Sequence, residues 1–169
     1  MSEGKTLPGA GDLAIVLHSH MPYVEGFGTY PFGEEWLFDA VIRSHLPVLE
    51  VARDLTMTVT PVLADQLEAE GVSERLAGFL QEFRLGAARR DVETADPDHV
   101  PAARAEVDRY EKAAVLLERV GGSPLAAFAA VRDRNVSLIP SSATHAVLPL
   151  LATRAGLDLQ IDAGLASHR

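Results

Sequence analysis

A continuous apolar run, LAIVL at residues 13–17, constrains the fold of this chain more than any other segment. Such a run is typical of a strand that is buried on both faces of a parallel sheet. Two further segments have strand character: TMTVT at 56–60, which alternates polar and apolar residues, and VSLIP at 136–140. Helical stretches separate the three segments. Strands arranged in this order pair in parallel, so we expect an α/β fold.

The stretches between the strands have the periodicity of amphipathic helices. The first is expected to begin at Glu34 with an apolar stripe that includes Leu37, Val48 and Val51, and Pro47 is expected to kink or split it. Further helices are expected at about 73–92, 100–120 and 124–134, and from Asp158 onward. The helical stretch between strands two and three is longer than a normal crossover. It predicts an insertion that lies over one end of the sheet.

Composition limits the classes of protein to which the chain can belong. Its 169 residues suffice for one domain, and residues 1–11, which are polar and Gly-rich, are expected to form a disordered lead-in. The net charge of -9 argues against a nucleic-acid partner, and the absence of cysteine excludes disulfides and thiolate metal sites. The sequence contains neither a signal-like apolar segment nor a membrane-spanning one. We therefore expect a cytoplasmic protein that acts on a neutral substrate.

Three histidines follow predicted strands. His18 and His20 come directly after the first apolar run, where period-two alternation places both imidazoles on one face, and His145 follows the third strand. Ligands of α/β proteins bind at the carboxyl ends of parallel strands, so the three residues are candidates for one site. Two alternatives remain open. The histidines could bond only to nearby loop backbone, or the H-x-H pair could bind zinc with His145 as a third ligand.

The loop after the first strand is rich in aromatic residues, namely Tyr23, Phe27, Tyr30, Phe32 and Trp36. Aromatic rings stack on the apolar faces of sugar rings, and nearby histidines would bond the hydroxyls. The same residues would equally suit a small core formed by the loop itself, with Trp36 anchoring the following helix.

Carboxylates are poorly placed for catalysis. Glycosidic chemistry requires two carboxyl groups, and the acids near strand ends are Glu25, Glu34, Glu35 and Asp65. Glu34 and Glu35 fall in a first helical turn, which favours carboxylates for electrostatic reasons alone. No Gly-rich phosphate loop, G-x-S-x-G motif or cysteine nucleophile is present. The sequence therefore offers no catalytic residue.

Several segments together resemble glycoside hydrolase family 57, and most closely its 1,4-α-glucan branching members. LAIVLHSHMPYV is similar to the first signature of that family, and EEWLFDAVIRSHLPVLEV is similar to the helix after it. SSATHAVLPLL resembles the second signature, and QIDAGLASHR resembles the helix that precedes the third. The resemblance covers nearly all of residues 12–169, and the two signatures in order are more specific than either alone.

This resemblance implies a (β/α)7-type barrel, of which residues 12–169 would form a truncated, amino-terminal catalytic-barrel segment. It also implies a retaining mechanism on α-glucans such as amylose, glycogen or maltooligosaccharide, without a metal or other cofactor. His18, His20 and His145 would bind the sugar and Trp36 would line its subsite. The catalytic Glu and Asp would fall beyond Arg169, in a missing carboxyl-terminal part that would act as a partner.

The chain by itself is therefore expected to be inactive. A non-catalytic glucan-binding module is the first alternative function. A metal-dependent hydrolase that uses the H-x-H pair is the second.

Overall fold

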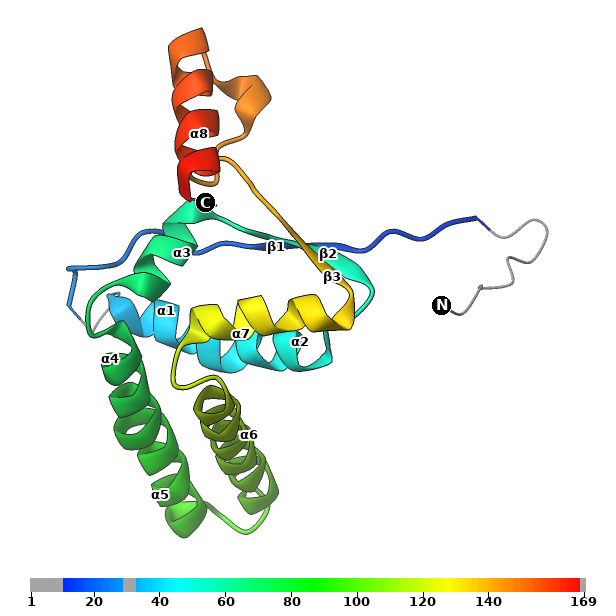
Figure 1. Ribbon diagram of the computed structural model, residues 1–169. Coiled ribbons are helices and arrows are strands. Elements are labelled where there is room, and N and C mark those ends of the chain that lie inside the picture. Colours follow the sequence, from blue (N-terminus) through cyan, green and yellow to red (C-terminus); the bar gives the residue numbers. More distant parts are fainter. Residues whose placement is uncertain (1–10, 29–32, 168–169) are drawn as a thin grey trace.

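The computed structural model describes residues 11–28 and 33–167, and its centre is a parallel sheet of three strands in the order β1-β2-β3 (Figure 1). The strands are β1 (Val16–Ser19), β2 (Leu55–Val59) and β3 (Val136–Ile139). In the first register row, Thr56 pairs with Val16 and Ser137. In a later row, Thr58 pairs with His18 and Ile139. The α/β class and the parallel pairing expected from the sequence are confirmed.

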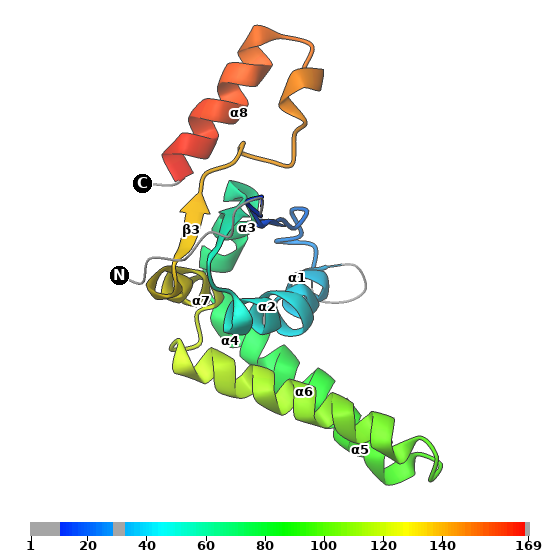
Figure 2. The ribbon, with the colours of Figure 1, turned by 90° about the vertical axis from the view of Figure 1, so that its right-hand side faces the viewer.

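The first strand begins three residues later than its apolar run. Leu13 and Ile15 are 86% and 48% exposed, because β2 begins only at Leu55 and the ladder starts where Thr56 N–H donates to the Ile15 carbonyl. Burial on both faces was also a wrong expectation, since Val16 is 60% exposed. In the part of the chain that the structure describes, helices cover only one face of the sheet (Figure 2).

The covered face packs against α1 (Glu34–Ala40), η1 (Val41–His45), α2 (Leu46–Val51) and α7 (Pro124–Ala130), with α3 (Pro61–Glu68) following β2 (Figures 1 and 2). Alternate strand residues point into this layer. The buried core includes Met57, Val59, Val136, Leu37, Phe38, Ile42, Leu63 and Phe128. The residues between them, including His18, Thr56, Thr58 and Ser137, consequently lie on the opposite, open face.

Pro47 does not interrupt the first helix in the way the sequence suggests. The break in regular α-helix comes earlier, at the π-helical turn η1, and the backbone at His45 and Leu46 keeps right-handed helical angles. A π-turn adds one residue to the helix and so rotates the buried stripe around its axis. Val48 and Val51 are therefore exposed, contrary to expectation, and Leu46 and Leu49 are buried in their place.

The long insertion between β2 and β3 is confirmed, but its expected position is wrong. It contains α4 (Val72–Gly78), η2 (Phe79–Leu85), α5 (Gly86–Thr94) and α6 (Val100–Arg119) before α7 and η3 (Val131–Arg134). Helix α6 packs against η1 and α2, and η2 contacts α1, instead of covering an end of the sheet (Figure 2). An ion pair and a hydrogen bond favour this position: Arg84 pairs with Asp39, and Arg43 donates to the Tyr110 hydroxyl at 3.0 Å.

The chain closes with η4 (Leu148–Leu150) and α8 (Arg154–Ser167), which begins four residues before the expected Asp158. Helix α8 extends away from the body of the fold and contacts α3 (Figure 1). No single helix in 11–28 or 33–167 is long and apolar enough to cross a membrane. The pair formed by Val100–Arg119 and Pro124–Arg134, bent by 74°, meets the length and composition criteria together.

Candidate functional site: a histidine cluster at the strand ends

The three predicted histidines converge at the carboxyl end of the sheet. The ring centroids of His18 and His20 lie 6.3 Å apart with an interplanar angle of 17°. The His145 ring reaches both of them, at 4.9 Å from His18 and 4.5 Å from His20. Period-two alternation and the parallel strand order therefore placed all three imidazoles correctly.

Two threonines, one in β2 and one directly after it, support the first pair of histidines. His18 Nδ1 lies within hydrogen-bond reach of Thr58 Oγ1, its register partner, and His20 Nδ1 lies 3.3 Å from Thr60 Oγ1. The site thus has two rows at the ends of β1 and β2, with one imidazole and one hydroxyl in each row. The sequence analysis missed both threonines. The signal that would have found them is the T-x-T spacing of the second strand, which matches H-x-H in the first.

His145 is positioned by helix α8 and not by a strand partner. The N–H of Ala143 donates to the Gln160 carbonyl at 2.9 Å, and the N–H of Thr144 donates to Gln160 Oε1 at 3.0 Å. Gly164 permits this close approach, because a Cβ at that position would lie 2.3 Å from the Ser141 carbonyl oxygen. The last helix therefore sets the distance between His145 and the other two rings.

Burial and mutual repulsion keep the paired histidines neutral. Desolvation first, and then the nearby His145, lower the pKa of His18 below its usual 6.5. The pKa of His20 is lowered by desolvation first, then by His145 and by His18. Apart from desolvation, neighbouring imidazoles are the only cause of the lowered pKa values of His18 and His20 among the described residues. At neutral pH His18 and His20 can therefore donate and accept hydrogen bonds without carrying charge.

The described aromatic residues of the first loop are exposed. Tyr23 is 56% exposed, Phe27 70% and Trp36, in the first turn of α1, 47%. The buried positions of this loop are instead Met21 and Val24. Tyr30 and Phe32 lie outside the described residues. The role of Trp36 in lining the site stays a prediction.

The two carboxylates at the start of α1 have structural partners. Glu34 is buried and receives two hydrogen bonds from the Arg75 guanidinium, at 2.8 and 2.6 Å. Glu35 is also buried and accepts from the Gly33 N–H at 2.9 Å. Both contacts hold the start of α1, as expected of acids in a first helical turn.

The zinc alternative finds no ligand set in this geometry. Across residues 11–28 and 33–167, no group of three or more His, Cys, Asp or Glu side chains is arranged to hold a metal ion. The three imidazoles contact one another ring to ring, and His18 and His20 also contact threonine hydroxyls.

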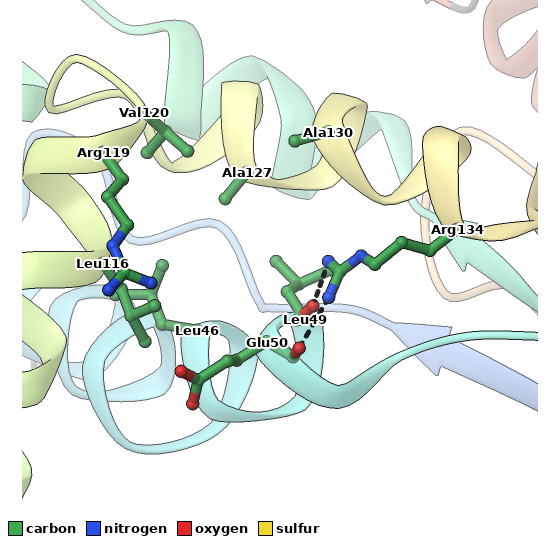
Figure 3. A pocket seen from close by; sticks show the side chains of 9 residues that line it. All are labelled: Leu46, Leu49, Glu50, Leu116, Arg119, Val120, Ala127, Ala130 and Arg134. Carbon is green, nitrogen blue, oxygen red and sulfur yellow. Dashed lines mark hydrogen bonds between the residues drawn. The ribbon is translucent and has the colours of Figure 1, made fainter.

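A separate cavity of about 210 Å³ lies between α2, the end of α6 and α7 (Figure 3). Its walls are mostly apolar, with Leu46, Leu49, Leu116, Val120 and Ala127 among them. The Arg134 guanidinium crosses one side and donates to the backbone carbonyls of Leu49 and Glu50 (Figure 3). Those bonds cap the carboxyl end of α2, so the polar edge of this cavity serves the fold.

No family model matches the chain, but individual proteins do. It is 33% identical over 168 residues to the 1,4-alpha-glucan branching enzyme TK1436 of Thermococcus kodakarensis, a match that covers 94% of this chain and 25% of that enzyme. It is 30% identical over 172 residues to the probable 1,4-alpha-glucan branching enzyme Rv3031 of Mycobacterium tuberculosis, covering 87% of this chain and 32% of the relative.

Solved structures agree with these matches. The GH57-type branching enzyme of Pyrococcus horikoshii superimposes with a TM-score of 0.80 at 30% identity, covering 90% of this chain and 31% of that one. The alpha-amylase AmyC of Thermotoga maritima also gives 0.80, at 25% identity, covering 92% and 32%. The chain spans about a quarter to a third of the length of the relatives it matches. It belongs to glycoside hydrolase family 57, and it corresponds to an amino-terminal portion of that family's branching enzymes.

Proposed function

We propose that this chain supplies the histidine-lined part of an α-glucan site, of the kind used by family 57 branching enzymes. The observation that carries the proposal is the convergence of His18, His20 and His145 at the strand ends, within 6.3 Å of one another. Imidazole nitrogens suit sugar hydroxyls, which both donate and accept hydrogen bonds. Exposed Tyr23, Phe27 and Trp36 offer ring faces on which a hexose could stack.

The chemistry that we propose for the complete site is retaining cleavage of an α-1,4 link, followed by transfer of the glucan chain. Such a reaction needs one carboxylate as nucleophile and a second carboxyl group as general acid. Glu34 and Glu35 are committed to Arg75 and to the Gly33 N–H. We assign both catalytic groups to a segment outside these 169 residues. The three histidines would bind and orient the sugar, and they would not attack it.

Binding is tested by titrating the chain with maltoheptaose and following ligand and imidazole resonances by NMR. We expect saturable shifts at the three histidines. His145→Ala should weaken binding by about fivefold to tenfold, because one hydrogen bond to the sugar is lost. Trp36→Ala tests the predicted stacking in the same assay. His99→Ala is the matched control, since His99 is exposed at the start of α6 in the insertion. Equal losses in the His99 and His145 variants would contradict the assignment.

Transfer is tested by incubating the purified chain with amylose and analysing the product for new α-1,6 links. No branching is expected from the chain alone, and branching is expected once a segment carrying the two carboxylates is added. Activity of the 169 residues by themselves would refute the proposed division of labour. Glucan binding that never leads to transfer in any combination would instead identify a non-catalytic binding module.

A further inference from the structure

The side chain of Thr60 does not perform the task that its position suggests. It is the N-cap residue of α3, followed by Pro61, where a threonine hydroxyl normally accepts a hydrogen bond from the first helical turn. No such side-chain cap is formed, and the turn is held by backbone bonds from Leu63 and Ala64 to the Thr60 carbonyl. The hydroxyl instead faces His20 Nδ1 at 3.3 Å.

Burial decides which of these two atoms donates the proton. Thr60 is 0% exposed, so its hydroxyl cannot donate to water, and His20 Nδ1 is its only recorded partner among the described residues. If Nδ1 carried the proton, the buried O–H would be left without an acceptor, and such a loss is costly. The favourable arrangement is therefore O–H donating to a bare Nδ1. The same reasoning applies to Thr58, which is 9% exposed and faces His18 Nδ1.

The second nitrogen of each ring is then the one that meets a ligand. Within 11–28 and 33–167, Nε2 of His18 and of His20 has no hydrogen-bond partner, and His18 is exposed to solvent. The one buried unpartnered side-chain atom in those ranges is His45 Nε2, so His20 Nε2 reaches solvent.

We propose that Thr58 and Thr60 are positioning residues that hold His18 and His20 in the tautomer with the proton on Nε2. Both imidazoles then present N–H donors to the open face, where they suit acceptor oxygens such as those of a sugar. The identity of that ligand rests on the proposed function, whereas the tautomer does not. Protonation of either ring would place a second N–H against the threonine hydroxyl, which would have to turn without a buried acceptor. The arrangement thus also favours the neutral ring.

Long-range ¹H–¹⁵N spectra of the unliganded full chain test the proposal directly, because they distinguish protonated from bare ring nitrogens. We expect bare Nδ1 and protonated Nε2 for His18 and His20. Thr60→Val keeps the shape and costs no side-chain cap, and it should move His20 toward a mixture of tautomers. Thr60→Ser should restore the single tautomer, and Thr58→Val should have the matching effect on His18.

Thr56→Val is the control, because Thr56 lies on the same strand and face but pairs with Val16 and Ser137. It should leave both spectra unchanged. A proton on Nδ1 in the unmodified chain would overturn the proposal, and so would a Thr60→Val spectrum identical to that of the parent. All these spectra are recorded without glucan, so failure of maltoheptaose to bind would count against the proposed function alone. Where binding is seen, Thr60→Val should weaken it by about fivefold and Thr60→Ser by less.

Discussion

At the scale of single residues, imidazoles occupy two different environments in this fold. His18, His20 and His145 have each other and two threonine hydroxyls as neighbours. His45 lies in the π-turn against Phe128, with ring centroids 5.5 Å apart and a buried Nε2 that has no partner in the described structure. The first environment suits a ligand, whereas the second only tolerates a neutral ring.

Acid should therefore destabilise the chain partly through His45. Desolvation lowers its folded-state pKa below the usual 6.5, so the unfolded chain takes up a proton more readily than the folded one. The free energy of unfolding should consequently decrease as the pH falls from about 6.5 through the lowered pKa, and should be highest above that window. We expect His45→Phe, which keeps the ring contact, to lose less stability than the parent between pH 7.5 and pH 5.5. Urea denaturation at the two pH values measures this, and equal losses would contradict the argument.

The residues of the site were only partly predictable. His18, His20 and His145 could be found because their strand-end positions are visible in the apolar pattern. Thr58 and Thr60 could not be assigned in the same way, because alternating threonines are ordinary β-strand residues. Their role depends on the register between β1 and β2, which pairs Thr58 with His18 and is a tertiary property.

At the scale of elements, long-range polar contacts decide where helices stop. Arg134 of η3 donates to the last carbonyls of α2, and so joins the start of β3 to the end of a helix more than eighty residues earlier (Figure 3). A positive charge at a helix carboxyl end is also favourable electrostatically. The sequence around Arg134 gives no sign of this partner.

Arg134→Met should lower the free energy of unfolding by about 2 kcal/mol, because hydrogen bonds from a charged donor are lost and the carbonyls remain partly buried. Arg132→Met, on the same 3-10 turn but exposed, is the control and should change stability by less than about 0.5 kcal/mol. Urea titrations of the two variants at pH 7.5 give the comparison. A similar loss in both would show that charge, and not the cap, matters.

A second element-scale prediction concerns the packing of α8 against the 141–145 segment. Gly164→Ala should displace that segment, because the new Cβ would lie 2.3 Å from the Ser141 oxygen, and His145 should move with it. We expect weaker maltoheptaose binding and altered His145 resonances. Gly78→Ala places a methyl group in open space in α4 and should leave both unchanged, while stabilising the helix by up to about 1 kcal/mol. Unchanged His145 resonances in Gly164→Ala would show that α8 does not position the ring.

Elements were predictable as types but less so at their edges. The three strands and the helices at 100–120 and 124–134 follow from local periodicity. Ser123 caps α7 by accepting from the Ala126 N–H at 3.3 Å. The start of β1 depends on where β2 begins, and the exposed positions Val48 and Val51 depend on the π-turn. Neither feature leaves a local signal in the sequence.

At the scale of the whole molecule, the described sheet has helices on one face and an open face opposite (Figure 2). β1 and β3 are its edge strands, and apolar Val16 and Ile139 are 60% and 40% exposed on the open side. Unpaired edges beside apolar surface favour association with other chains.

We therefore expect the isolated chain to associate increasingly as its concentration rises. Val16→Lys combined with Ile139→Lys should suppress this association, because charges on edge strands oppose pairing. Val115→Lys, on α6 with a similar exposure of 46%, serves as the control and should not. Sedimentation velocity across a range of concentrations measures the effect. A strictly monomeric parent chain would show that the open face is not adhesive.

The central position of β2 also affects how readily the sheet opens locally around the histidine cluster. Among the described strands it alone has a neighbour on both sides, and the hydroxyls beneath His18 and His20 lie in it and directly after it. Its amide protons should be the slowest to exchange with deuterium, since the edge strands can fray while the middle one stays closed. The threonine hydroxyls beneath the histidine cluster would then outlast its rim, so a partly opened molecule would keep these hydroxyls in place while the rings on the frayed edge move.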